Sequence, residues 1–200
     1  AGVGDADGDG IGDVLVGAWG EDTVGTDAGQ AWLVAGPITA DAALEDIGEP
    51  FSAEASYDNL GFTVAGAGDT DGDGLADLLI GAPFHDEGGS RAGIVFLHTA
   101  SETTRFIGGR SGDELGQSLS TAGDLNGDGL DDVVLGAWRT LTPDKQRPGA
   151  AWMWYGPVSG TRDAWGADLL LLGEEGDDRA GAAVTDAGDL NGDGLGDVAV

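Results

Sequence analysis

Short apolar stretches alternate with polar, glycine-rich segments along the whole chain. The stretches are four to eight residues long, rich in Val, Leu, Ile and aromatic residues, and bounded by Gly, Pro or Asp. This pattern is typical of β-strands. No window of eleven residues carries a clear apolar stripe at helical spacing, so little helix is expected. The pattern predicts an all-β protein.

The apolar stretches follow the same order in each of three periods of about 60 residues. Each period contains four strands, here named A, B, C and D. Strands A are expected at 61–68, 116–123 and 181–188; strands B at 14–19, 78–83, 133–138 and up to Val200; strands C at 30–35, 93–97 and 150–155; and strands D near 50–53, 103–107 and 168–172. Four antiparallel strands per period are typical of a β-propeller blade, and the Gly and Ala of strand A suit the crowded innermost position.

The ends of the chain do not coincide with the ends of the periods. We expect a first blade at 1–58 that lacks strand A, because residues 1–4 are too short for it, then blades at 59–113 and 114–178 and the start of a fourth at 179–200. Propellers close with about 4 to 8 blades. The chain is therefore expected to be part of a larger propeller.

An acidic loop of nine residues joins strand A to strand B and occurs four times, at separations of 55 to 65 residues. Positions 1, 3, 5 and 9 carry Asp or Asn, position 6 is Gly, and position 7 is apolar and offers its carbonyl oxygen. Ca²⁺ binds six to eight such oxygen atoms. We therefore predict up to four Ca²⁺ ions. The ligands would be Asp5, Asp7, Asp9, Ile11 and Asp13; Asp69, Asp71, Asp73, Leu75 and Asp77; Asp124, Asn126, Asp128, Leu130 and Asp132; and Asp189, Asn191, Asp193, Leu195 and Asp197.

Two other interpretations of the loop are weaker. An EF-hand requires Glu at position 12 and flanking helices, whereas position 12 is Val16, Ile80, Leu135 or Val200 and the flanks are β-type. Ion-free Asp-rich turns would leave several carboxylates in close contact, at a cost of about 1–4 kcal/mol per pair at 4 Å. Mg²⁺ is disfavoured because it demands a strict octahedron and retains its waters.

The second period carries the most specific combination of motifs. Gly61-Phe62 stands near its start, the acidic loop follows, and Gly81-Ala82-Pro83 comes after strand B. This combination resembles the FG-GAP repeat of integrin α-subunit propellers and their bacterial relatives. The Phe-Gly pair is inverted or replaced in every copy, and Trp19 and Trp138 stand where the second period has Pro. The resemblance implies a seven-bladed propeller with calcium on one rim, of which this chain holds roughly half.

The charge of the chain narrows the possible partners. The chain has 37 Asp and Glu against 8 Lys and Arg, a formal net charge of -29. Such an excess argues against binding to nucleic acid phosphates or to an anionic membrane face. No apolar run approaches the length of a membrane span, so no membrane insertion is expected. The absence of Cys excludes disulfides and thiolate zinc sites.

Other residues have ordinary explanations in this pattern. Trp19 and Trp138 are equivalent by repeat, as are Trp32 and Trp152, and we expect these four to pack between blades. His85 and His98 are expected at the surface or at strand ends. The connections after strand B, 20–29, 84–92 and 139–149, vary most in sequence. Binding residues concentrate in such loops.

Three functional classes fit these observations. The first is a calcium-stabilised, extracellular or cell-surface adhesion or recognition module whose partner is a protein or a glycan. The second is a lectin-like propeller that stacks sugars on Trp. The third is an accessory propeller of a secreted hydrolase such as a phospholipase D-like enzyme. No catalytic constellation is visible, so we do not expect the chain itself to be an enzyme.

Overall fold

The structure, a computed structural model, describes residues 1–142 and 146–200. These residues form fifteen strands, one helix of four residues (α1, Leu44–Ile47) and one 3-10 turn (η1, Ala164–Gly166). The prediction of an all-β fold is confirmed. Within the described part, no helix is long and apolar enough to cross a membrane.

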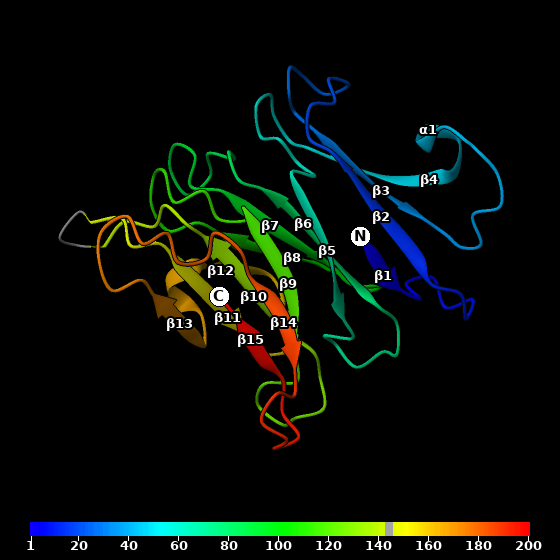
Figure 1. Cartoon of the computed structure of the whole chain (residues 1–200). Helices are drawn as coiled ribbons and strands as arrows, with labels where there is room; N and C mark the ends of the chain where they lie inside the picture. The colour runs from blue at the N-terminus through cyan, green and yellow to red at the C-terminus, as the bar shows by residue number, and fades with distance from the viewer. Residues whose placement is uncertain (143–145) are drawn as a thin grey trace.

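The strands form successive antiparallel sheets that stand side by side in chain order (Figure 1). The first sheet contains β1 (Gly2–Gly4), β2 (Asp13–Ala18), β3 (Gln30–Val34) and β4 (Gly48–Ser52); the second β5 (Thr63–Gly68), β6 (Asp77–Ala82), β7 (Ile94–His98) and β8 (Thr103–Ile107); the third β9 (Ser118–Gly123), β10 (Asp132–Ala137), β11 (Ala150–Trp154) and β13 (Leu169–Leu172); and the last β14 (Thr185–Gly188) and β15 (Asp197–Ala199). The order A, B, C, D is confirmed, and β1, β5, β9 and β14 approach one another as innermost strands. The sheets are propeller blades.

The start of the chain differs from the prediction. Gly2–Gly4 forms β1, which pairs with β2 through Gly2 and Val14. The ammonium group of Ala1 also donates to the carbonyl oxygen of Leu15 at 2.8 Å. The expectation that residues 1–4 are too short for a strand is wrong, because three residues suffice when a neighbouring strand and a buried Val3 hold them in place.

Glycine near the end of strand B allows adjacent blades to touch. A Cβ atom on Gly136 would lie 2.2 Å from the carbonyl oxygen of Gly181, which begins the next blade, and 2.2 Å from Ser118 Oγ. Gly17 and Gly81 occupy the same position against the blades that follow them. The Gly-Ala sequence after strand B is therefore a contact between blades.

We expect Gly136→Ala to lower the free energy of unfolding by about 3 kcal/mol, because the new methyl group meets backbone of the next blade. Denaturant unfolding in calcium measures the loss. Gly2→Ala is the matched control, since nothing lies within 4 Å of the added methyl group. Equal stability of the two variants would show that the blades do not meet at Gly136.

The tryptophan predictions are confirmed only in part. Trp152 is fully buried, in a core cluster shared by the second and third sheets. Trp32 is also buried, but it lies against Gly48 of its own blade. Trp154, which the repeat pattern did not constrain, packs against Phe106 of the preceding sheet, with ring centroids 4.5 Å apart. Trp19 is instead 51% exposed, and Trp138 is half-buried. These two positions follow strand B, where the chain emerges at the rim.

A strand that the sequence did not predict joins two blades. β12 (Thr161–Asp163) leaves the third blade and pairs in parallel with β8 of the second. Arg105 N–H donates to the carbonyl oxygen of Gly160 at 2.9 Å. Pro50 occupies the position of Arg105 on β4, and proline has no N–H to donate. The first blade therefore cannot donate the same bond at this position.

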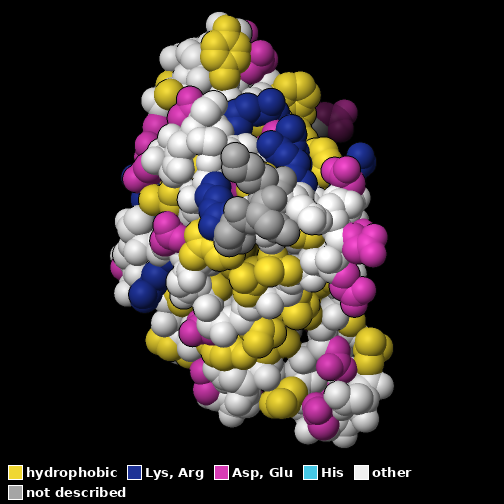
Figure 2. All heavy atoms as spheres, turned by 90° about the vertical axis from the view of Figure 1, so that its left-hand side faces the viewer, with side chains coloured by type: hydrophobic (Ala, Val, Ile, Leu, Met, Phe, Trp, Pro, Cys, Tyr) yellow, Lys and Arg dark blue, Asp and Glu magenta, His cyan; other side chains and the backbone are white. Residues whose placement is uncertain are grey.

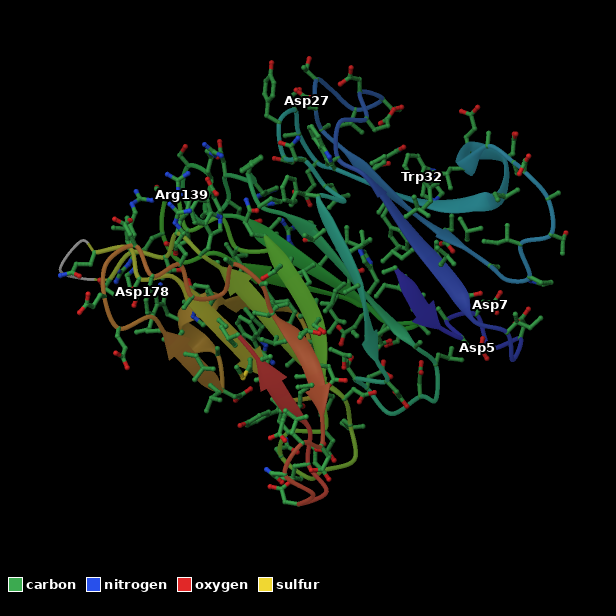
Figure 3. All side chains as sticks on the ribbon, viewed as in Figure 1. Asp5, Asp7, Asp27, Trp32, Arg139 and Asp178 are labelled. Carbon is green, nitrogen blue, oxygen red and sulfur yellow. The ribbon has the colours of Figure 1, made fainter. Side chains whose placement is uncertain are left out.

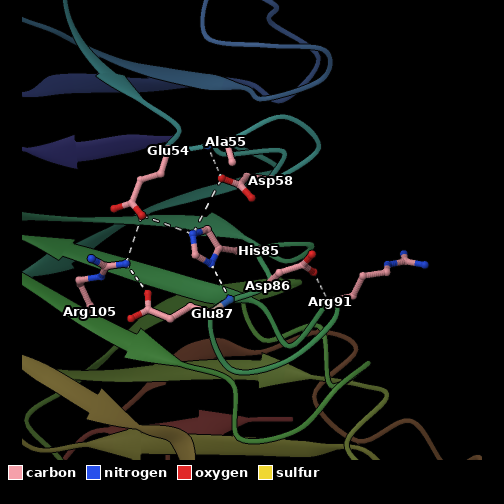
Figure 4. A network of polar contacts seen from close by, with 8 residues as sticks. All are labelled: Glu54, Ala55, Asp58, His85, Asp86, Glu87, Arg91 and Arg105. Atoms are coloured by element: carbon pink, nitrogen blue, oxygen red, sulfur yellow. Dashed lines mark hydrogen bonds and ion pairs between the residues drawn. The ribbon is translucent and has the colours of Figure 1, made fainter.

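A polar network connects the first two blades (Figure 4). His85 Nδ1 accepts the Glu87 N–H at 3.1 Å, while Nε2 lies 3.6 Å from Glu54 Oε2 and 3.9 Å from Asp58 Oδ2. Arg105 bridges Glu54 and Glu87. His85 was expected at the surface or a strand end; it is buried beneath these side chains. His85 therefore has a structural role at the contact between the two blades.

Asp113, in the turn before β9, is fully buried. Oδ1 accepts the Leu141 N–H at 3.2 Å, and Oδ2 has no hydrogen-bond partner in the described part of the chain. Burial raises the pKa of this carboxyl to about 6. The folded state therefore binds the proton more tightly than the unfolded state does, so this group favours folding below about pH 4 and loses that contribution as the pH rises through 6.

We expect Asp113→Asn to raise the free energy of unfolding by about 1–3 kcal/mol near pH 7.5 and to leave it unchanged near pH 4. The variant removes a buried charge that the wild-type chain carries only at the higher pH. Urea unfolding of both proteins at the two pH values measures the difference. A stability difference that does not change with pH would contradict this explanation.

Candidate metal loops

The four acidic loops connect strands A and B at one end of the blades. Figure 3 places Asp5 and Asp7 at this end, and Asp27 and Arg139, in connections between strands B and C, at the opposite end. The loops have repeat-equivalent hydrogen bonds, so one description serves all four. Positions in each loop are numbered from its first Asp.

The carboxylate at position 1 holds the loop closed. In the first loop, Asp5 Oδ1 accepts the Gly8 N–H and Oδ2 accepts the Gly10 N–H, both at 2.8 Å. Gly10 has φ of +87°, which a residue with a side chain rarely adopts. Asp69, Asp124 and Asp189 accept the corresponding pairs of N–H groups. These donors lower the pKa of Asp124, chiefly through Gly129, and of Asp189, chiefly through Gly194.

Positions 3 and 5 are oriented by shorter turns. Asp7 Oδ1 accepts the Asp9 N–H at 3.0 Å, and Asp9 Oδ1 accepts the Ile11 N–H at 2.7 Å. The second loop repeats both bonds. Each bond uses one oxygen of the carboxylate, so the second oxygen is not engaged by this turn. The loop is thus curled, and its side chains are oriented, by its own backbone.

Position 9 ties the end of the loop to its start. One oxygen of Asp13, Asp77, Asp132 and Asp197 accepts the N–H of residue 2 of its own loop, at 2.8 to 2.9 Å. The second oxygen of Asp13 and of Asp132 accepts a backbone N–H from a residue beyond strand C, each at 2.9 Å. The sequence analysis did not anticipate these bonds, because the donors are backbone N–H groups. The two donors beyond strand C, Gly36 and Gly156, each precede a proline.

The equivalent oxygen of Asp77 is the exception. Asp77 is 1% exposed, and its Oδ1 has no hydrogen-bond partner in the described part of the chain. Burial, together with electrostatic repulsion from Asp71 and Asp73, raises the pKa of Asp77 to about 6. A buried oxygen without a partner, beside further carboxylates, is the environment that a bound cation satisfies.

The structure gathers some of the predicted ligands and not others. Carboxylate oxygens of Asp5, Asp7 and Asp13 lie within 4.8 Å of one another, and so do those of Asp69, Asp71 and Asp77. Asp9 and Asp73 lie outside these groups. In the third loop, Asn126 replaces the second acid and donates through Nδ2 to Asp128 Oδ2 at 2.9 Å. The fourth loop has Asn191 at the same position. The first two loops therefore concentrate more negative charge.

Neighbouring loops are bonded to each other. The N–H at position 8 of each later loop donates to the carbonyl oxygen at position 1 of the loop before it: Ala76 to Asp5 at 2.9 Å, Asp131 to Asp69 at 3.0 Å, and Gly196 to Asp124 at 2.8 Å. The backbone therefore links each loop directly to the loop of the next blade.

The apolar residue at position 7 also contacts the preceding loop. Leu75 lies over Gly8 of the loop before it, and Leu130 and Leu195 repeat this contact. Ile11 belongs to the first loop, which has no loop before it, and is 41% exposed. The apolar residues at position 7 thus help to pack loop on loop.

Comparison with known proteins agrees with this geometry. The family model described as FG-GAP repeat matches residues 60–98 and 115–150. The first segment contains strands A to C of the second blade, and the second contains strands A and B of the third, each with its acidic loop. The chain carries FG-GAP repeats. The first blade, whose strand A has only three residues, lies outside the match.

Curated relatives of these FG-GAP repeats are integrin α subunits. Integrin alpha-PS2 of Drosophila melanogaster is 37% identical over 149 residues, 70% of this chain and 10% of the relative. Integrin alpha-4 of Xenopus laevis is 34% identical over 145 residues, 67% of this chain and 14% of the relative. Integrin alpha pat-2 of Caenorhabditis briggsae is 30% identical over 220 residues, 99% of this chain and 17% of the relative. The chain thus spans less than a fifth of the length of these relatives.

Proposed function

We propose that the chain is part of an extracellular, integrin-like recognition propeller that Ca²⁺ stabilises, and that it binds a protein ligand rather than catalysing a reaction. The observation that carries the metal part of this proposal is the gathering of Asp69, Asp71 and Asp77, whose carboxylate oxygens lie within 4.8 Å of one another although Asp77 is buried and its Oδ1 has no partner in the described part of the chain. The homology to integrin α subunits supports the adhesive part.

The residues present fit Ca²⁺. Each loop offers carboxylate or amide oxygens at positions 1, 3, 5 and 9 and a backbone carbonyl at position 7, all hard oxygen donors of the kind that this ion prefers. We propose the twenty residues named above as the four ligand sets. Extracellular modules bind Ca²⁺ with Kd of about 10⁻⁴–10⁻³ M, which calcium outside cells saturates and cytosolic calcium does not.

In this proposal the role of Ca²⁺ is structural. Carboxylates that repel one another would be drawn together by the ion, which orders the loop between strands A and B. Since each loop is hydrogen-bonded to the loop before it, order in one loop supports the contact between two blades. We further propose that the chain is about half of a seven-bladed ring, with blades at 1–58, 59–113 and 114–178 and a fourth that begins at 179.

A lectin-like function is a second candidate because aromatic side chains are exposed at the end opposite the acidic loops. Trp19 lies against Phe62, with centroids 6.3 Å apart, and Phe62 against Phe84 at 5.9 Å. Sugars stack on such surfaces. A glycan array probed with the intact chain and with Trp19→Ala, both in calcium, distinguishes the candidates: glycan binding that the substitution abolishes would replace the protein-ligand proposal.

A further inference from the structure

Three arginines whose side chains reach solvent form a row at the end of the molecule opposite the acidic loops. Arg91 lies between β6 and β7, Arg139 between β10 and β11, and Arg179 in the turn before β14. We call these three residues the arginine row. Figure 2, which faces the left-hand side of Figure 1, shows Lys and Arg side chains gathered in the upper part of the view. Such a gathering is unusual in a chain with net charge -29.

A single buried carboxylate holds two members of the row. Glu114 is 2% exposed, and its Oε1 lies 2.9 Å from Arg91 Nη2 and 2.9 Å from Arg139 Nη1. The side chains of Arg91 and Arg139 are 50% and 34% exposed. The negative charge is therefore inside, and the two guanidinium groups face solvent with an excess of positive charge.

Trp138 links the second and third members. The guanidinium of Arg139 lies 5.4 Å from the centre of the indole ring, and that of Arg179 lies 5.2 Å from it. Stacking on an aromatic face restrains a guanidinium while leaving the N–H groups along its edge free to donate. In the described part of the chain, Arg179 has no ion pair within 4 Å.

The repeat does not require these arginines. Between the first and second blades, Asp27 occupies the position of Arg91, and Asn59 occupies that of Glu114. Asn59 fills its place by donating to the carbonyl oxygen of Trp19 at 3.2 Å. The first and second blades thus meet without arginine at these positions, whereas the second and third blades meet through Arg91 and Glu114. A departure from the repeat, in connections between strands, is typical of a binding surface.

We propose that the arginine row binds a carboxylate-bearing segment of a protein partner, an inference that rests on the recognition role proposed above. Arginine presents paired N–H groups that match the two oxygens of an Asp or Glu carboxylate. A long polyanion fits less well, because four exposed carboxylates flank Arg179. These are Glu174, Glu175, Asp177 and Asp178. A compact acidic segment can reach the row without meeting them all.

The test uses the intact chain in calcium and an acetylated hexapeptide that alternates Asp and Gly. Arginine Nε–H signals are followed by NMR during the titration. We expect the signals of Arg91, Arg139 and Arg179 to shift, and the shifts to vanish in about 1 M salt, where the Debye length is about 3 Å. Arg179→Gln should weaken binding about two- to fivefold, the effect of one exposed charge pair.

Arg162→Gln is the matched control, since Arg162 is exposed on β12 and outside the row. Equal peptide affinity of the two variants would overturn the proposal, and so would tighter binding of a sulfated oligosaccharide than of the peptide to the same arginines. Calcium binding, measured separately by calorimetry, keeps the two proposals apart. Peptide binding without calcium binding would reject the metal role alone, whereas calcium binding without peptide binding would reject the arginine row alone.

Discussion

Replacing Asp69 with Ala is expected to remove one bound Ca²⁺ and to lower the free energy of unfolding in calcium by about 3–5 kcal/mol, the range for loss of a partner from a charged, hydrogen-bonded cluster. The substitution removes a proposed ligand and also the acceptor of the Gly72 and Gly74 N–H groups. Because Ala76 and Asp131 bond the second loop to the loops on either side, the first and third blades should loosen too.

Calorimetric titration with Ca²⁺ and hydrogen exchange measure these two effects. Asp41→Ala is the control, because Asp41 is an exposed acid in the connection between β3 and α1 and belongs to none of the acidic loops. The variant should keep the calcium stoichiometry of the wild-type chain. An unchanged stoichiometry in Asp69→Ala would reject the second loop as a calcium site.

Replacing Asp77 with Asn should have opposite effects in the two metal states. Without calcium, the wild-type chain buries a carboxylate whose Oδ1 has no partner. The neutral amide removes that charge, so metal-free Asp77→Asn should be more stable than metal-free wild type by about 1–3 kcal/mol. With saturating calcium the order should reverse, because the variant has lost an anionic ligand.

Urea unfolding in calcium and in excess chelator measures both differences. Asp132→Asn is the matched comparison, since both oxygens of Asp132 accept N–H groups and the amide would lose one of these bonds. In excess chelator, Asp132→Asn should therefore gain less stability over wild type than Asp77→Asn does, or none. If Asp77→Asn were less stable than wild type in both buffers, the proposal that Asp77 is a calcium ligand with an unsatisfied charge in the metal-free chain would be rejected.

The strands and the loops could be predicted from the sequence because both are local features. Strands such as Leu78–Pro83 are apolar runs bounded by Asp and Gly, and the predicted bounds differ from β6 by one residue at each end. The acidic loops are recognisable because the acidic residues of each loop lie within nine consecutive positions of the sequence. Because the acidic loop occurs four times at the same place relative to the predicted strands, the sequence pattern indicated propeller blades.

The features that were missed depend on residues far apart in the chain. β12 consists of three exposed residues and carries no apolar signal; it forms because Arg105 offers an outward N–H where Pro50 cannot. The bonds between loops join backbone groups more than sixty residues apart. The arginine row likewise depends on Glu114, which a sequence pattern presents as one more acid in an acidic chain.

The most direct test of the central claim, that Ca²⁺ in the acidic loops holds the blades together, is thermal unfolding followed by far-UV circular dichroism. The chain is heated once in about 2 mM Ca²⁺ and once in excess chelator. The bonded loops and the unpartnered Asp77 predict a markedly higher midpoint in calcium. A chain that is folded in both buffers and unfolds at the same temperature in each would contradict the claim.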